Sequence, residues 1–205
     1  MYINAELTMK KDRMDQLPWV SQLATTCACT MRLVEPWFHT RRIIVGDSWF
    51  GSVRTCLELM KMGLYSVLAV KIGHKQFPKQ PLLERIKERF SFSCMARLFS
   101  VGSECISLIA AAWMDKKEML VVASCMDDNP TPPVERLRSK FKDGRVQKLR
   151  YNVEQRRVHA FYREHFNGID LLNRLALGPC TIADGWRPHN GVHDELKQVF
   201  ITQWP

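Results

Sequence analysis

The sequence has little that would direct the chain to a membrane or to secretion. Its longest apolar run, Cys105 to Met114, is interrupted by Ser107 and is far too short to span a bilayer. The first fifteen residues are polar and lack the apolar core of a signal peptide. The sequence also has no internal repeat and no low-complexity tract. These absences predict a soluble intracellular protein that does not bind a membrane.

The seven cysteines do not have the spacing of a metal site or a disulfide framework. Cys27 and Cys29 form the only close pair, but one residue rather than two separates them and no second pair follows. His159, His165 and His193 are not spaced as ligands of one ion. An odd number of cysteines, most of them in apolar stretches, is typical of buried free thiols in a reducing compartment.

Acidic residues are in deficit, with 21 Asp and Glu against 30 Lys and Arg, and the formal net charge is +9. Such an excess indicates a partner rather than a fold, and nucleic acid and acidic membrane surfaces are the usual candidates. Most of the excess lies in residues 134–163, where ten Lys or Arg stand against three acids. This segment follows Asn129 to Pro133 (NPTPP), which predicts a break in the chain.

Hydropathy patterns predict one mixed α/β domain. Residues 1–40 read as a helical and loop segment, residues 41–176 as the core with its basic segment, and residues 177–205 as a tail. The predicted strands are 41–47, 65–72, 105–113 and 119–125. The predicted helices are 49–62, 82–90 and 155–175, and Gly63 is expected to end the first of them. The strand 65–72 is apolar at nearly every position, which predicts burial on both faces.

Three acidic positions lie at or near element ends. Asp47 ends the first strand, Asp127 and Asp128 follow the strand 119–125, and Asp170 lies within the helix 155–175. Carboxylates that converge at one edge of a sheet would form an oxygen cage for Mg²⁺, which can support phosphodiester displacement. The residues alone leave other roles open: Asp47 as a helix cap, Asp127 and Asp128 as turn residues, and Asp170 as a solvated helix position.

Four stretches in this order resemble blocks of the piggyBac transposase family, over about residues 30–190. VGDSWFGS is similar to the block of the first aspartate, and SVLAVKIGHKQFP to the strand and basic turn that follow it. AAWMDKKEMLVVASC resembles the Trp-x-Asp-Lys-Lys hairpin with the strand of the second aspartate. YREHFNGIDLLNRL matches the Tyr-Asn-x-x-x-Gly-Gly-Val-Asp-x-x-Asp block without a gap.

This resemblance implies a ribonuclease-H-like mixed sheet with flanking helices, and cleavage and transfer of DNA strands with Mg²⁺ (or Mn²⁺). The implied metal ligands and catalytic residues are Asp47, Asp127 and Asp170. Double-stranded DNA is the implied partner, a homodimer the implied assembly and the nucleus the implied location. The basic segment then predicts a phosphate-contacting surface, whose binding to DNA would weaken with salt and would not depend on the base sequence. Its DNA-binding residues are Arg136, Arg138, Lys140, Lys142, Arg145, Lys148, Arg150, Arg156 and Arg157.

The sequence also departs from the family pattern. Met126 stands at the position of the second aspartate, next to Asp127, and a one-residue slip beside a strand turns a side chain to the other face. Arg163, Asn167 and Asn173 replace an Asn, a Gly and an Asp of the third block. We therefore expect a truncated, degenerate or domesticated core. Two alternatives are a non-enzymatic DNA-binding module on the same fold, and an unrelated basic α/β protein. The basic segment has its own alternative as a solvated helix or loop without a partner.

Overall fold

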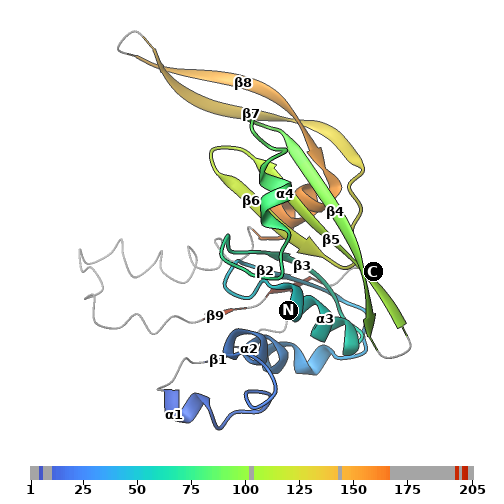
Figure 1. The fold of residues 1–205 in the computed structure, drawn as a ribbon. Helices are drawn as coiled ribbons and strands as arrows, with labels where there is room; N and C mark the ends of the chain where they lie inside the picture. The colour runs from blue at the N-terminus through green and yellow to red at the C-terminus, as the bar shows by residue number, and fades with distance from the viewer. Residues whose placement is uncertain are drawn as a thin grey trace, which may run out of the picture.

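The computed structural model describes residues 5–6, 11–101, 104–142, 145–166, 197–198 and 200–202. It confirms the predicted mixed α/β class. A six-stranded sheet in the order β10-β2-β3-β6-β5-β4 forms the centre, with helices on both faces (Figure 1). Its strands are β2 (Ile43–Gly46), β3 (Tyr65–Ala69), β4 (Phe92–Val101), β5 (Glu104–Met114), β6 (Glu118–Ala123) and β10 (Phe200–Thr202). Only β2 and β3 pair in parallel; the other neighbouring strands of this sheet run antiparallel.

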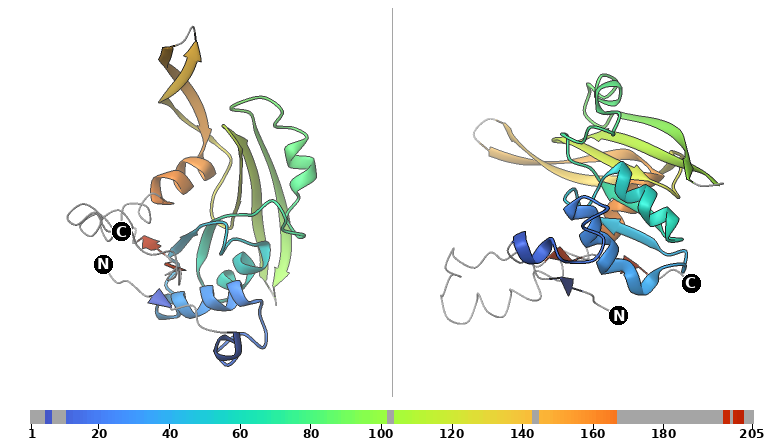
Figure 2. Two further views of the ribbon diagram at one scale, coloured as in Figure 1. Left: turned by 90° about the vertical axis from the view of Figure 1, so that its left-hand side faces the viewer. Right: turned by 60° about the horizontal axis from the view of Figure 1, so that its bottom comes forward.

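Strand β3 lies between β2 and β6 and is buried on both faces, as its apolar sequence predicts. Val67 and Leu68 point to opposite faces, and both are fully buried. Two apolar clusters cover these faces. One contains Leu68 with α2 (Thr25–Val34), α3 (Val53–Lys61) and α4 (Lys79–Leu83), and the other contains Val67 with Val158 and Tyr162. Figure 2 shows the helical residues 157–166 and α4 on opposite sides of the sheet.

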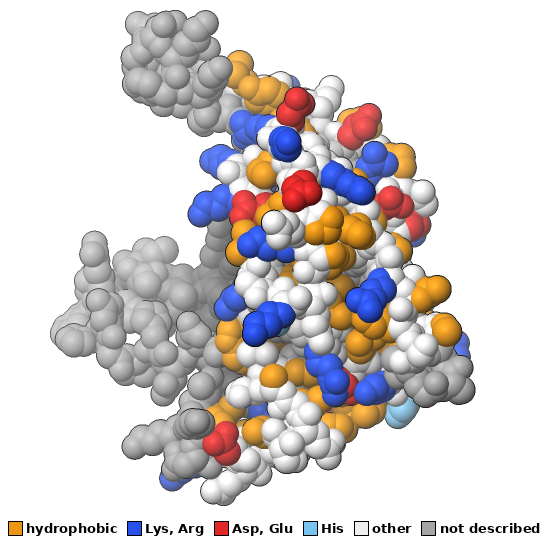
Figure 3. Space-filling model, viewed as in Figure 1, with side chains coloured by type: hydrophobic (Ala, Val, Ile, Leu, Met, Phe, Trp, Pro, Cys, Tyr) orange, Lys and Arg blue, Asp and Glu red, His pale blue; other side chains and the backbone are white. Residues whose placement is uncertain are grey.

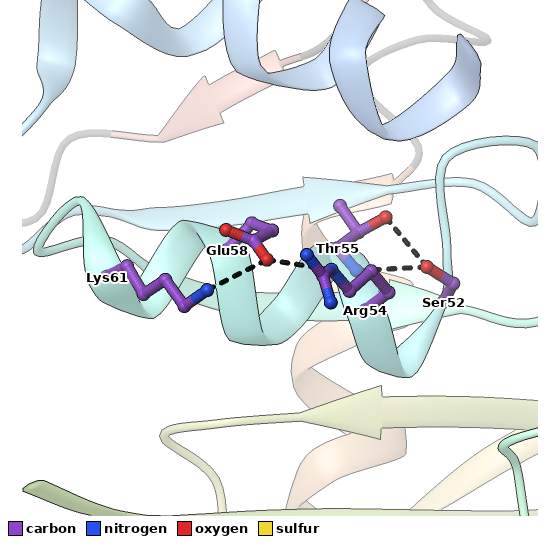
Figure 4. A network of polar contacts seen from close by, with 5 residues as sticks. All are labelled: Ser52, Arg54, Thr55, Glu58 and Lys61. Carbon is purple, nitrogen blue, oxygen red and sulfur yellow. Dashed lines mark hydrogen bonds and ion pairs between the residues drawn. The ribbon is translucent and has the colours of Figure 1, made fainter. Parts of the chain in front are cut away.

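Helix α3 connects β2 to β3 and has clear start and stop signals. The Ser52 hydroxyl accepts a hydrogen bond from the Thr55 backbone N–H at 3.0 Å and so caps the first turn (Figure 4). Farther along, the nearly buried Glu58 carboxylate pairs with Arg54 at 2.7 Å and Lys61 at 3.0 Å. Beyond the last turn, Gly63 adopts the left-handed conformation that its sequence position predicts.

Strand β4 was not predicted, and the helix predicted over 82–90 is wrong over most of its length. Helix α4 ends at Leu83, and Ile86 is buried beyond it. Phe90 then takes a positive φ of 67°, and its N–H donates to the Met114 carbonyl. This turn directs the chain into β4, which pairs with β5 from Glu104 to Trp113.

Most of the described basic segment forms strands, and only residues 157–163 of it are helical. Strands β7 (Pro130–Lys142) and β8 (Arg145–Arg156) pair as a long antiparallel hairpin, which projects from the body (Figure 1). We call this hairpin the arm. The predicted break at 129–133 corresponds to the change from residues 126–129, which form no helix or strand, to the root of the arm, although Pro130 already belongs to β7. The register shifts between Thr131 and Val134, and this irregularity at the root accommodates the prolines.

None of the six described cysteines forms a disulfide, as predicted. The predicted burial holds for Cys27, Cys29 and Cys56, whereas Cys94 and Cys125 are half-buried and Cys105 is exposed. In the part of the chain that the structure describes, no helix is long and apolar enough to cross a membrane. The remaining short elements are β1 (Ala5–Glu6), α1 (Lys11–Met14), the 3-10 helix η1 (Glu35–Trp37) and β9 (Lys197–Gln198).

We expect Cys105 to react with a maleimide well before Cys56 and Cys125 in the folded protein. Cys105 is exposed, whereas burial raises the pKa of Cys56 and of Cys125 to about 12, and the thiolate is the reactive form. Peptide mapping by mass spectrometry after brief labelling at mildly alkaline pH measures the order. Cys105→Ser is the control that removes the fast site, and labelling of Cys56 at the same rate as Cys105 would contradict the burial.

Candidate nucleic-acid cleft

A cleft of about 1040 Å³ opens at the end of the sheet where β3 runs out. Its walls are the residues after β3, the turn between β5 and β6, the first part of β7 and the helical residues 157–166. Ser48, which follows β2, also lines it. The cleft therefore lies between the main sheet and the root of the arm.

The charged groups of the cleft are mostly positive. Five cations line it: Lys71, Lys116, Lys117, Arg136 and Arg163. Three acids line it: Asp115, Glu118 and Glu164. Of these acids, Asp115 also contacts Arg89 at 3.5 Å. Lys and Arg side chains are spread over the face of the molecule in Figure 3 as well. This balance favours an anionic ligand over a cationic one.

Asp47 lies at the end of the sheet that borders this cleft. Its carboxylate Oδ1 accepts a hydrogen bond from the Trp49 N–H at 2.8 Å, and its carbonyl accepts from Phe50 and Gly51 at 3.2 and 3.1 Å. The residue thus closes a tight turn after β2. Because Ser52 caps α3, the alternative that Asp47 caps this helix is wrong.

Asp127 follows β6 through residues 124–129, which belong to no strand. Val45 pairs with Val67, and Val67 pairs with Ala123, so the three residues form one row across the sheet. Because β6 runs antiparallel to β3, β6 and β2 leave this row in opposite directions along the sheet. That Asp47 and Asp127 share one metal site stays a prediction.

The structure gives Asp127 a different role. Its Oδ1 accepts from the Asn129 N–H at 3.2 Å, and its Oδ2 accepts from Arg157 Nη1 at 3.1 Å. The carboxylate thus shapes the turn before β7 and ties it to the first residue of the helix 157–166, as the turn alternative predicts. Met126, at the second-aspartate position, packs against the apolar cluster of Val67 and Tyr162.

The third predicted ligand, Asp170, lies outside the described residues. Within the described ranges, no group of three or more His, Cys, Asp and Glu side chains could hold a metal ion. A site built on Asp47 and Asp170 therefore remains a prediction.

The arm carries the predicted DNA-binding residues except Arg157, which begins the helix 157–166, and several of them also make contacts within the chain. Arg150 pairs with Glu135 at 3.4 Å, and Arg157 pairs with Asp127. Arg156 lies over the Phe92 ring at 5.3 Å. Lys148 is exposed. The side chains of Arg138, Lys140, Lys142 and Arg145 lie outside the part that the structure describes.

A cluster that sequence reasoning missed lies where the arm meets the helix. Gln155 is only 4% exposed. With its amide oxygen facing the cleft arginines, it accepts from Arg136 Nη2 at 3.0 Å and from Arg163 Nη1 at 3.2 Å. The Arg163 guanidinium lies over the Trp113 ring at 5.2 Å. The one available signal was that Arg163 departs from the family pattern, and nothing in the sequence connected it to Gln155.

Comparisons with known proteins complete the description. A sequence model for the family described as Transposase IS4 matches residues 2–177. One similar solved structure is a cryo-EM structure of a piggyBac transposase synaptic complex with hairpin DNA, at 17% identity and a TM-score of 0.48. The alignment covers 78% of this chain and 30% of that chain, so this chain spans less than a third of its length. Comparison with curated proteins gave no match.

Proposed function

Because the chain belongs to the Transposase IS4 family, we propose that it is a degenerate transposase core that binds double-stranded DNA and cleaves it slowly with Mg²⁺ or Mn²⁺. The family predicted from the four motifs is confirmed by this membership. The observation that carries the proposal is the basic arm, which leads into a positively charged cleft at the end of the sheet that Asp47 borders.

DNA binding is supported by the shape and charge of the arm. A two-stranded ribbon is one of the elements that the major groove of B-form DNA admits. Lys and Arg on such a ribbon neutralise backbone phosphates and release counterions, whatever the base sequence. Binding through the arm would therefore weaken steeply as the salt concentration rises.

Metal-dependent cleavage is supported by Asp47 and by the position of Asp170 in the sequence. Phe166 lines the cleft. The sequence predicts one helix over 155–175, and on such a helix positions 166 and 170 share a face. Two carboxylates offer the oxygen ligands that Mg²⁺ prefers, and a bound ion would activate water or a DNA 3′ oxygen for phosphodiester displacement. With Asp127 paired elsewhere, the site has fewer anionic ligands than the three implied by the motifs, which is why we expect slow cleavage.

A second candidate is a non-enzymatic DNA-binding module on the same fold. The observation that favours it concerns the position of the second aspartate. Met126, which stands there, packs in an apolar cluster, and the neighbouring Asp127 pairs with Arg157. This candidate shares the DNA-binding arm with the first and differs in having no response to divalent ions.

We expect Mg²⁺ or Mn²⁺ to raise the unfolding midpoint of the parent chain and not that of Asp47→Ala. At about ten times the Kd of the metal, the gain is about 1.4 kcal/mol, or about 4 °C in Tm. Thermal unfolding with and without the metal measures it, and a nicking assay on plasmid DNA with Mn²⁺ tests cleavage.

Asp127→Ala is the matched control for this test. It should lower Tm slightly through loss of an exposed ion pair, yet keep the metal-dependent rise. A rise that vanishes in Asp127→Ala would show that Asp127 takes part in metal binding in spite of its pairing with Arg157. No rise in the parent chain would favour the non-enzymatic module.

A further inference from the structure

The residues Arg136, Gln155 and Arg163 come from three different elements and meet at the mouth of the cleft. They belong to β7, β8 and the helical residues 157–166. Both arginines line the cleft and direct N–H groups at the same end of the Gln155 amide, which must therefore be its oxygen; in that orientation the oxygen accepts from them at 3.0 and 3.2 Å. Gln155 is only 4% exposed, so its amide belongs to the interior of the protein rather than to the surface.

This arrangement holds two positive charges close together. Since each donor nitrogen lies about 3 Å from the same oxygen, the two guanidinium groups approach within about 6 Å. Like charges at this distance repel each other, and a neutral amide positions them without neutralising either. An anion between or across the two guanidinium groups would relieve the repulsion.

The orientation of Arg163 is fixed from a second side. Its guanidinium lies over the ring of Trp113, a residue that is 2% exposed. Stacking on an indole and hydrogen bonding to a buried amide together leave few rotamers for this side chain. A planar guanidinium held in advance loses little entropy when it binds, and its paired N–H groups match the oxygens of a phosphate.

We propose that Arg136 and Arg163, positioned by Gln155, bind one backbone phosphate of DNA at the mouth of the cleft. The proposal rests on the proposed function for the identity of the ligand. It places a DNA strand across the cleft at the root of the arm, on the side of the sheet that carries the helix 157–166. Gln155 acts as a positioning residue, because it contacts the arginines and not the phosphate.

The test is binding of a fluorescein-labelled DNA duplex to the full chain in EDTA, followed by fluorescence anisotropy over a range of salt concentrations. Arg163→Gln should raise Kd about tenfold and lower the magnitude of the salt slope by about one, because one phosphate contact is lost. Gln155→Glu should raise Kd at least as much, because a carboxylate would pair with both arginines in place of the phosphate. Pairing with both arginines should also leave the Tm of Gln155→Glu at or above that of the parent chain, which separates lost binding from lost folding.

Gln80→Glu is the matched control, since it makes the same chemical change at an exposed position of α4, on the other face of the sheet. It should change Kd by less than about twofold. If Arg163→Gln and Gln155→Glu bind DNA as tightly as Gln80→Glu, with the parent salt slope, this inference is overturned while the proposed DNA binding stands. Failure of the parent chain to bind DNA overturns both.

Inorganic phosphate distinguishes the two sources of the same chemical group. It should compete with DNA only weakly, because a single free anion lacks the other contacts along the arm. If inorganic phosphate raises the Tm of the parent chain and not that of Arg163→Gln, while both bind DNA equally, the site takes a free phosphate and the assignment to the DNA backbone is wrong.

Discussion

The variant Gly51→Ala is expected to unfold at a midpoint about 10 °C below that of the parent chain, a loss of about 3 kcal/mol. A Cβ added at Gly51 would lie 1.5 Å from the carbonyl oxygen of Ala69 and 2.7 Å from its carbonyl carbon. These are backbone atoms of the buried central strand β3, so no side-chain rotation relieves the clash. The turn that holds Asp47 would have to move away from the sheet.

Gly73→Ala is the control, because nothing lies within 4 Å of a Cβ added there. Its midpoint should stay within about 2 °C of the parent value. Thermal unfolding followed by circular dichroism measures both variants. If Gly51→Ala and Gly73→Ala unfold together, the turn after β2 does not pack on β3 as described.

Acidification is expected to destabilise the folded chain through one buried histidine. His159 is 1% exposed and lies between the rings of Phe92 and Trp113, at 5.5 and 6.1 Å between ring centroids. Burial lowers the pKa of His159 to about 4, and the Met119 backbone partly offsets this shift. No hydrogen bond of good geometry within the described residues reaches its ring nitrogens, so burial dominates.

The direction of the effect follows from the two pKa values. In the unfolded chain the pKa of a histidine is about 6.5, so on acidification the unfolded state takes up the proton first. The stability associated with neutral His159 is therefore complete above about pH 6.5 and is lost as the pH falls toward 4. The full loss is about 3 kcal/mol.

His159→Phe is the matched variant, because it keeps an aromatic ring between Phe92 and Trp113 and removes the titration. Urea unfolding at several pH values gives the difference in free energy of unfolding between parent and variant. This difference should grow in favour of the variant as the pH falls from 6.5 to 4. Parallel loss of stability in both proteins would show that His159 is not the responsible group.

The strands that carry Asp47 and the apolar centre of the sheet were predictable, because their sequences are apolar at successive positions. Tyr65 to Ala69 reads as a strand from hydropathy alone, and Gly63 marks the end of the helix before it. Strand β4 was not predictable in this way. Its exposed Arg97 and Leu98 break the alternation that a half-buried strand would show.

The arm was missed for a different reason. Lys and Arg at close spacing are equally compatible with a solvated helix, a loop and an exposed ribbon, and Pro130, Pro132 and Pro133 indicated a break. Proline is tolerated at the first residue of a strand and at an irregularity, where no ladder hydrogen bond is lost. The pairing of β7 with β8 decides between the alternatives, and local sequence does not encode it.

The candidate site shows the same limit. The metal-ligand prediction for Asp127 comes from the resemblance and from its place after a strand, whereas its contact with Arg157 depends on tertiary packing. Arg136 lies 19 positions before Gln155 and Arg163 lies 8 positions after it, each in a different element. No helical or strand periodicity relates such positions, so the sequence does not predict their contact. In contrast, the family could be read from short motifs, because these depend on residue identity and not on strand direction.

The arm has 13 residues in β7 and 12 in β8, and it is attached to the body at one end, where Pro130 pairs with Arg156. At about 3.3 Å per residue the arm is about 40 Å long, so a rotation of only about 10° about its attached end would move its tip by about 7 Å. Because β8 continues directly into the helix 157–166, a force on the tip of the arm would act on the element that carries Tyr162 and Arg163, which line the cleft.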